Sequence, residues 1–123
     1  MPWNLDSKRP IYEQLIERVQ QDIVTGVYAP GEKLPSVRDL AALAAVNPNT
    51  MQKALAELEN SGLIYTQRTS GRFVTEDADQ IQQARNNLAL TQVRIYIQQM
   101  TQLGIDASDM VKLLSDTLKG EDL

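Results

Sequence analysis

The chain has 123 residues, a length typical of one domain, and 42% of its residues are apolar. It contains no cysteine and no histidine, which excludes disulfide bonds, thiolate or imidazole catalysis, and zinc sites built on these side chains. No apolar run approaches the roughly 20 residues of a membrane helix, and the N-terminus lacks the basic and then apolar pattern of a secretion signal. We therefore expect a cytoplasmic protein that needs no metal and no cofactor.

Charge is unevenly distributed along the chain. The net charge of -4 by itself argues against nucleic acid as a partner, because a DNA-binding surface has to neutralise phosphates. The stretch from Lys33 to Val74, however, holds five basic and three acidic side chains, whereas both flanks are acidic. This basic middle segment permits DNA binding without proving it.

The first 35 residues predict one helix and a turn. Pro10 suits the first position of a helix, which we expect to end near Gly26. Along this helix apolar residues recur at every fourth position, at Ile11, Leu15, Val19 and Ile23. The segment 28–35 contains two prolines and a glycine, so we expect a turn followed by a short extended piece.

Two further helices are predicted, with a short turn between them. Ser36, with Asp39 three residues later, resembles a capping box and predicts a helix over about 36–44. Asn47 is a good N-cap, and the proline after it suits the first position of a helix over about 48–61. A glycine directly after this second segment is a natural end for it.

The rest of the chain predicts a β-hairpin and two more helices. The segments 63–66 and 72–75 are rich in β-forming residues and flank a basic turn that ends in a glycine. The segment 77–103 has neither proline nor glycine and predicts a long helix. Two apolar rows run along that helix: Ile81, Ala84, Leu88 and Ile95 form one, and Leu90, Val93, Ile97 and Met100 form the other. A shorter helix over about 107–119, capped by Asp106, follows.

Three helices followed by a hairpin are typical of a winged helix-turn-helix, whose third helix enters the major groove of DNA with its first residues. Here that helix begins with small polar side chains that can reach base edges and phosphates. Asparagine and glutamine can form paired hydrogen bonds with adenine, threonine can bond a phosphate or touch a thymine methyl, and lysine can contact a phosphate. The candidate DNA-binding residues of this helix are Asn47, Asn49, Thr50, Gln52 and Lys53.

The same elements carry a sequence pattern that resembles the GntR family of bacterial transcription regulators. The pattern opens with Pro10-Ile11-Tyr12-x-Gln14-Leu15 and continues with Pro30-Gly31-x-x-Leu34-Pro35-Ser36-x-Arg38-x-Leu40-Ala41. Its later parts are Asn47-Pro48-Asn49-Thr50-Met51-Gln52, Gly62-Leu63-Ile64 and Gly71-x-Phe73-Val74. About 65 consecutive residues take part, with prolines and glycines in register, so the resemblance is far more specific than any single short motif.

The resemblance implies roles for particular residues. Arg38, early in the second helix, corresponds to an arginine that contacts the operator in this family, and Arg68 with Thr69 corresponds to wing residues near the minor groove. The family's contacting positions at the start of the third helix are occupied here by Asn47, Asn49, Thr50 and Gln52. Two departures affect these roles. Thr69 stands where many members have a glycine, which puts the course of the wing in question, and Pro48 replaces a position that is basic in some relatives.

Only about 48 residues follow the hairpin, too few for the large effector domains or the aminotransferase-like domain of other GntR members. A tail of one long and one short helix resembles the YtrA-like subfamily, whose tail is implied to dimerise. We therefore expect a mainly α protein, with a winged helix-turn-helix DNA-binding domain over 1–75 and a two-helix dimerisation extension over 76–123. Its expected function is that of a repressor rather than an enzyme, binding an inverted-repeat operator as a homodimer.

Other interpretations of these features remain open. Asn47 alone is more often only a helix cap, and Arg38 could pair with Asp39 or Glu32 instead of DNA. Arg72 is expected to be a spectator, because strand alternation could turn it away from the groove. The winged fold could instead serve as a protein–protein interaction module. A third alternative is an effector pocket at a dimer interface, which the sequence neither supports nor excludes.

Overall fold

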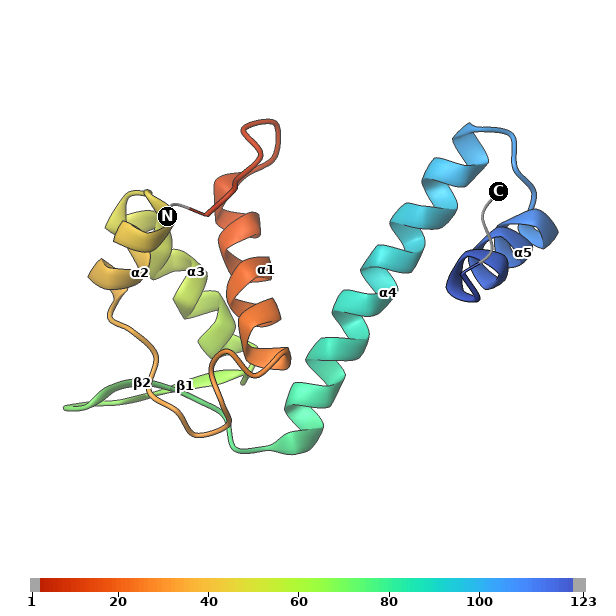
Figure 1. The fold of residues 1–123 in the computed structure, drawn as a ribbon. Coiled ribbons are helices and arrows are strands. Elements are labelled where there is room, and N and C mark those ends of the chain that lie inside the picture. Colours follow the sequence, from red (N-terminus) through yellow and green to blue (C-terminus); the bar gives the residue numbers. More distant parts are fainter. Residues whose placement is uncertain (1–2, 121–123) are drawn as a thin grey trace. The chain divides into compact units, whose positions relative to one another are not determined.

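The computed structural model describes residues 3–120, which form five α-helices and one two-stranded sheet (Figure 1). The predicted mainly α, winged helix-turn-helix fold is confirmed. Tertiary contacts divide the chain into two compact units, Met1–Leu88 and Ala89–Leu123, with the boundary inside α4 (Ala78–Gln102). Among residues 3–120, no helix has the length and apolarity that crossing a membrane requires.

The first unit begins with α1 (Ile11–Val24). The apolar residues at every fourth position of this helix pack into the core of the lobe, as predicted. Leu15 and Val19 are fully buried. Thr25 is the C-cap of the helix, and Gly26 follows with a φ of 84°. The prediction for Pro10 was wrong by one position: its backbone is extended at ψ 127°, so it is the N-cap and not the first helical residue.

The next two helices are α2 (Val37–Ala44) and α3 (Pro48–Asn60), and both begin at the caps that the sequence predicts. The Ser36 hydroxyl accepts the Asp39 N–H at 3.1 Å. The side-chain oxygen of Asn47 accepts the N–H two residues later at 2.8 Å. These bonds satisfy donors that have no partner within the helix, which explains why each helix begins where it does.

The turn between α2 and α3 depends on a residue that the sequence analysis did not single out. Ala45 has a φ of 59° and a ψ of 47°, and it is the only non-glycine residue among 3–120 with a positive φ. The Val46 N–H donates to the Ala41 carbonyl at 3.0 Å and closes the end of α2. The left-handed residue lets the chain reverse within three residues, from α2 to the cap of α3.

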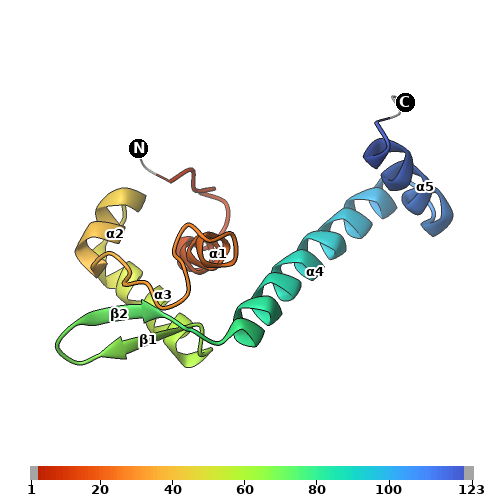
Figure 2. The same ribbon diagram turned by 60° about the horizontal axis from the view of Figure 1, so that its bottom comes forward.

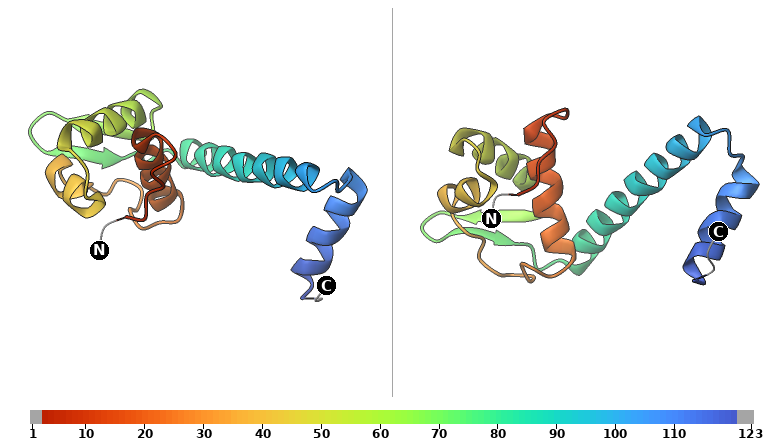
Figure 3. Two further views of the ribbon diagram at one scale, coloured as in Figure 1. Left: turned by 90° about the horizontal axis from the view of Figure 1, so that it is seen from above. Right: turned by 45° about the horizontal axis from the view of Figure 1, so that its top comes forward.

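The hairpin consists of β1 (Ile64–Gln67) and β2 (Gly71–Val74), which pair antiparallel (Figure 2). The rings of Tyr65 and Phe73 face each other across the ladder and stack with centroids 5.7 Å apart. The hairpin turn is closed by the Ser70 N–H, which donates to the Gln67 carbonyl at 3.0 Å. This hairpin is the wing, and its tip lies at the periphery of the lobe in all views (Figures 1 to 3).

The N-terminal part of α4 packs on the same lobe. Ile81 is buried in the core, and Ala84 and Leu88 pack against it, so these members of one predicted apolar row contact the lobe. Polar contacts add to this packing. The Arg85 guanidinium donates to the Val24 carbonyl, and the side-chain amide of Gln80 donates to a carbonyl at the end of α3 at 2.6 Å.

The second unit contains the rest of α4 and α5 (Ala107–Leu118), which a short connection joins (Figure 3). Gly104 in this connection has a φ of 79°. Asp106 caps α5 as predicted, accepting an N–H at 2.9 Å. The Tyr96 hydroxyl donates to the Met110 carbonyl at 2.7 Å and ties the two helices together. Between them lies an open apolar cavity of about 520 Å³, lined in part by Val93, Tyr96, Ile97, Met110, Val111 and Leu114.

Candidate nucleic-acid interface

The helix α3 has one apolar and one polar face. Its core face consists of Met51, Ala54, Leu55 and Leu58, all of which are at most 1% exposed. On the opposite face Asn49, Gln52 and Lys53 are exposed. The buried face fixes the helix to the lobe, so the exposed polar residues are held in a defined direction without contributing to the core.

The predicted contact residues of α3 differ in how the protein itself uses them. Asn47 is exposed but already engaged as the N-cap, and Thr50 is half-buried. Gln52 and Lys53 make no hydrogen bond or ion pair with any residue of 3–120, so their polar groups are available to another molecule. The first two turns of α3 therefore combine one side chain that caps the helix, Asn47, with two, Gln52 and Lys53, that make no polar contact within residues 3–120.

Arg38 lies in the first turn of α2, which buries Leu40 and Ala41 beneath it. Its side chain is exposed and forms no salt bridge with any residue of 3–120. Neither Asp39 nor Glu32, the two acids that the sequence offers as partners, pairs with Arg38. The Glu32 carboxylate instead accepts the Ala29 N–H at 2.8 Å.

The tip of the wing carries Arg68 and Thr69, both exposed. Gly71 has a φ of 111°, and it is the only described residue of the hairpin in the left-handed region. Thr69 therefore adopts a backbone conformation that any residue tolerates, and this wing does not require the glycine that many GntR members have there.

A second wing arginine is engaged inside the lobe. The Arg72 Nε donates to the Glu59 carboxylate at 3.0 Å, and the Thr66 hydroxyl donates to the same oxygen. The hydrogen bond from Thr66, followed by the bond and charge of Arg72, holds the pKa of Glu59 below its usual value. Glu59 was missed by the sequence analysis, and these contacts join the end of α3 to both strands of the wing.

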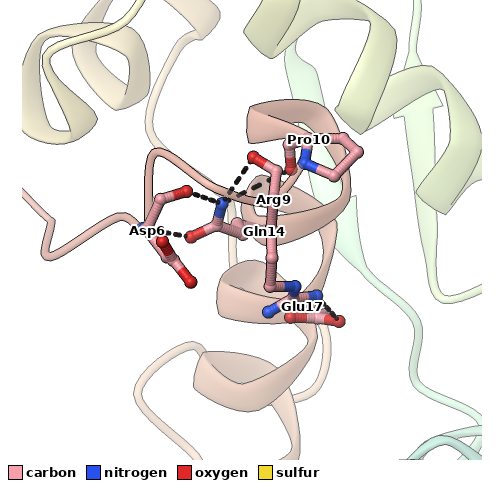
Figure 4. A network of polar contacts seen from close by, with 5 residues as sticks. All are labelled: Asp6, Arg9, Pro10, Gln14 and Glu17. Atoms are coloured by element: carbon pink, nitrogen blue, oxygen red, sulfur yellow. Dashed lines mark hydrogen bonds and ion pairs between the residues drawn. The ribbon is translucent and has the colours of Figure 1, made fainter.

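The N-terminal segment is fixed to α1 by the side chain of Gln14 (Figure 4). Its oxygen accepts the Asp6 N–H, and its nitrogen donates to the Asp6 carbonyl, each at 2.6 Å. The same nitrogen donates to the Arg9 carbonyl at 3.1 Å, and the Arg9 guanidinium pairs with Glu17 at 2.8 Å. Gln14 belongs to the sequence pattern of the GntR family. Its role here is to bind backbone groups of residues 6–9, which the sequence alone does not indicate.

The candidate residues fall into three groups: the start of α3, the start of α2 and the tip of the wing. Helix α3 packs against α2 and against β1. Among residues 3–120, no hydrogen bond or ion pair joins one group of candidate side chains to another. The scaffold therefore positions the three groups, and apart from the Asn47 cap their side chains stay available for an external partner.

Comparison with family models decides what this scaffold is. The model described as "Bacterial regulatory proteins, gntR family" matches residues 11–74, from α1 to the end of the wing. The chain belongs to the GntR family. Its members are transcription regulators with a DNA-binding domain, and the matched range contains all of the candidate DNA-binding residues.

Similar GntR proteins extend the comparison to the C-terminal helices. The transcriptional repressor YtrA of Bacillus subtilis is 41% identical over 101 residues, covering 82% of this chain and 73% of YtrA. The regulator YhcF of the same organism is 32% identical, with 93% of this chain and 94% of YhcF covered. A GntR-family regulator from Listeria monocytogenes has a TM-score of 0.82 at 40% identity, with 91% and 98% covered. The chain is thus a YtrA-like GntR regulator.

A solved structure of the AraR DNA-binding domain in complex with operator ORX1 is similar to part of this chain. It is 29% identical with a TM-score of 0.53, and it covers 61% of this chain and 92% of the AraR chain. In that structure the AraR domain is bound to its operator.

Proposed function

We propose that this GntR-family regulator is a homodimeric repressor that reads an inverted-repeat operator. The observation that carries the proposal is the division of α3 into a fully buried apolar face and an exposed polar start. A helix held in this way can lead into the major groove with its first residues. The operator complex of the similar AraR domain supports DNA as the partner.

The proposed contacts divide into base reading and backbone positioning. Gln52 and Asn49 are suited to base edges, whereas Arg38, Lys53 and Arg68 are suited to phosphates and the minor groove. The complete proposed set is Arg38, Asn47, Asn49, Thr50, Gln52, Lys53, Arg68 and Thr69. A regulator built in this way acts where the chromosome is, in the bacterial cytoplasm.

We assign DNA binding to residues 1–75 and dimerisation to residues 76–123. The support is the poorly buried second unit: within residues 89–120, Met110 is the only side chain that is buried. Val93, Ile97 and Leu114 are 50%, 46% and 48% exposed. A contiguous apolar surface of this kind is uncommon on a monomer, and a twofold pairing of identical surfaces would cover it.

A dimer of this kind accounts for repression. Two recognition helices related by a twofold axis match half-sites about one helical turn, or roughly 34 Å, apart. Occupancy of such a site within a promoter excludes the polymerase. The repressor name of the similar YtrA protein supports this sign of regulation.

Selection from random duplexes tests the proposal. The purified protein is expected to enrich a palindromic site, to protect both half-sites in footprinting, and to have the mass of a dimer by light scattering. A protein that stays monomeric at binding concentrations, or that enriches no site, would contradict it.

A further inference from the structure

The segment ahead of α2 forms an outer edge of the wing. The Leu34 N–H donates to the Arg72 carbonyl at 2.8 Å, and the Val74 N–H donates to the Glu32 carbonyl at 2.9 Å. Lys33 lies between these two bonds, opposite Phe73. Hydrogen bonds of the residues before and after Lys33 therefore hold its backbone beside β2.

The side chain of Lys33 lies across the base of the wing turn. A Cβ placed on Gly71 would lie 3.0 Å from Cε of Lys33 and 3.8 Å from its Nζ. The missing side chain at Gly71 thus leaves the room that the lysine occupies. Lys33 lines an open groove of about 550 Å³, which Ser36, Asp39 and Ser70 also line.

Lys33 differs from its basic neighbour in the same groove. Arg72 is paired with Glu59 at 3.0 Å. Lys33 is exposed and makes no hydrogen bond or ion pair with any residue from 3 to 120. The carboxylate of the adjacent Glu32 is engaged by the Ala29 N–H. Asp39 is the one acid that lines the groove, and it forms no ion pair with Lys33, so the ammonium has no acidic partner within residues 3–120.

We propose that Lys33 binds one backbone phosphate of the duplex at the base of the wing, adding a contact to those assigned above. This inference rests on the proposed DNA-binding function. A phosphate suits the position better than a base edge does, because Lys33 lies outside α3 and its ammonium is a compact point charge. The contact contributes affinity and register but reads no sequence.

Salt-dependent binding to duplex DNA tests this proposal. The probes are the selected site and a random duplex of equal length, and each protomer of the proposed dimer supplies one Lys33. The slope of log K against log salt is therefore expected to be shallower for Lys33→Gln by about 1.8, the value for two phosphates. The corresponding loss of affinity is about sixtyfold at 0.1 M salt relative to 1 M salt, and it is equal for both duplexes. Lys33→Arg is expected to restore the slope.

Lys119→Gln is the matched control, because it removes one exposed lysine from the end of α5 and is expected to leave the slope unchanged. If Lys33→Gln keeps the wild-type slope, or weakens only the selected site, the Lys33 contact is wrong while the proposed function stands. If the wild-type protein binds neither duplex, the proposed function fails and the contact fails with it.

Discussion

The Nε of Arg72 on β2 lies 3.0 Å from the Glu59 carboxylate on α3, so one of the two wing arginines is committed to the lobe. Both side chains of this pair are partly covered, at 20% and 33% exposure. Arg68, four residues earlier at the tip, has no such partner among residues 3–120. The two arginines of one hairpin are thus expected to serve stability and binding separately.

Substitution of each arginine tests this division. Arg72→Ala is expected to lower the free energy of unfolding by about 1 kcal/mol and to change DNA affinity little. Arg68→Ala is expected to leave stability within about 0.5 kcal/mol and to weaken binding to the selected duplex. Urea unfolding and fluorescence titration measure the two effects. Equal losses of affinity in both variants would contradict the division.

The dependence of stability on pH follows from Glu59. Its pKa is lowered in the folded protein, first by the Thr66 hydroxyl and then by Arg72, so the unfolded chain takes up this proton at a higher pH. The stabilisation is therefore fully present above the usual glutamate pKa of 4.5 and is lost as the pH falls through the lower folded value. Wild type is expected to exceed Glu59→Gln in stability by about 0.5 to 1 kcal/mol at neutral pH, a difference that shrinks in acid.

Glu57→Gln, at an exposed position of the same helix, provides the control for that experiment. Thermal unfolding is followed for all three proteins between about pH 6 and about pH 3. A difference between wild type and Glu59→Gln that stays constant over this range would show that the carboxylate contacts contribute no proton-linked stability.

Local signals predicted the helices well, because their limits are set within a few residues along the chain. Asn47 caps α3 with its own side chain and needs no distant partner. The contacts of Glu59 depend instead on strands that come seven and 13 residues later, and a single sequence gives no sign of that pairing. The position of Lys33 could not be predicted for the same reason, because its side chain lies beside Gly71 of β2, which is distant in the sequence.

Ala45 marks a second limit, because a left-handed residue after a helix is usually predicted from glycine or asparagine. Its φ of 59° costs an alanine roughly 1 kcal/mol or more. Ala45→Gly is expected to raise the free energy of unfolding by about 0.5 kcal/mol. Relief of the left-handed strain outweighs the greater backbone entropy that glycine has in the unfolded chain. Ala42→Gly, exposed within α2, is expected to lower it by about 1 kcal/mol. A fall in stability for Ala45→Gly in urea unfolding would be the opposite of this expectation.

Asn47 and Gln52 separate the capping role from the reading role at the start of α3. Asn47→Ala is expected to cost about 1 kcal/mol of stability, whereas Asn47→Ser keeps a capping oxygen and its stability. Gln52→Ala is expected to leave stability unchanged and to reduce discrimination at one base pair by about 1 to 3 kcal/mol. Duplex titrations with single-base variants measure that discrimination. If Asn47→Ser binds as tightly as wild type, Asn47 is a cap and not a contact.

The exposed apolar surface of the second unit provides the test of dimerisation. Ile97 on α4 is 46% exposed, and a charge placed there would have to be desolvated in a pairing of two copies. Ile97→Glu is therefore expected to be monomeric by light scattering and to bind the inverted repeat about a hundredfold or more weakly, because the second half-site no longer adds avidity. Binding to a single half-site is expected to persist, since the winged lobe is unchanged.

Gln98→Glu, an exposed polar position on the same helix, controls for the added charge. Leu90→Glu, 45% exposed and outside the α4–α5 cavity, separates loss of pairing from damage to the packing of α5. Dimers of wild-type affinity from both Ile97→Glu and Leu90→Glu would mean that two copies meet through another surface.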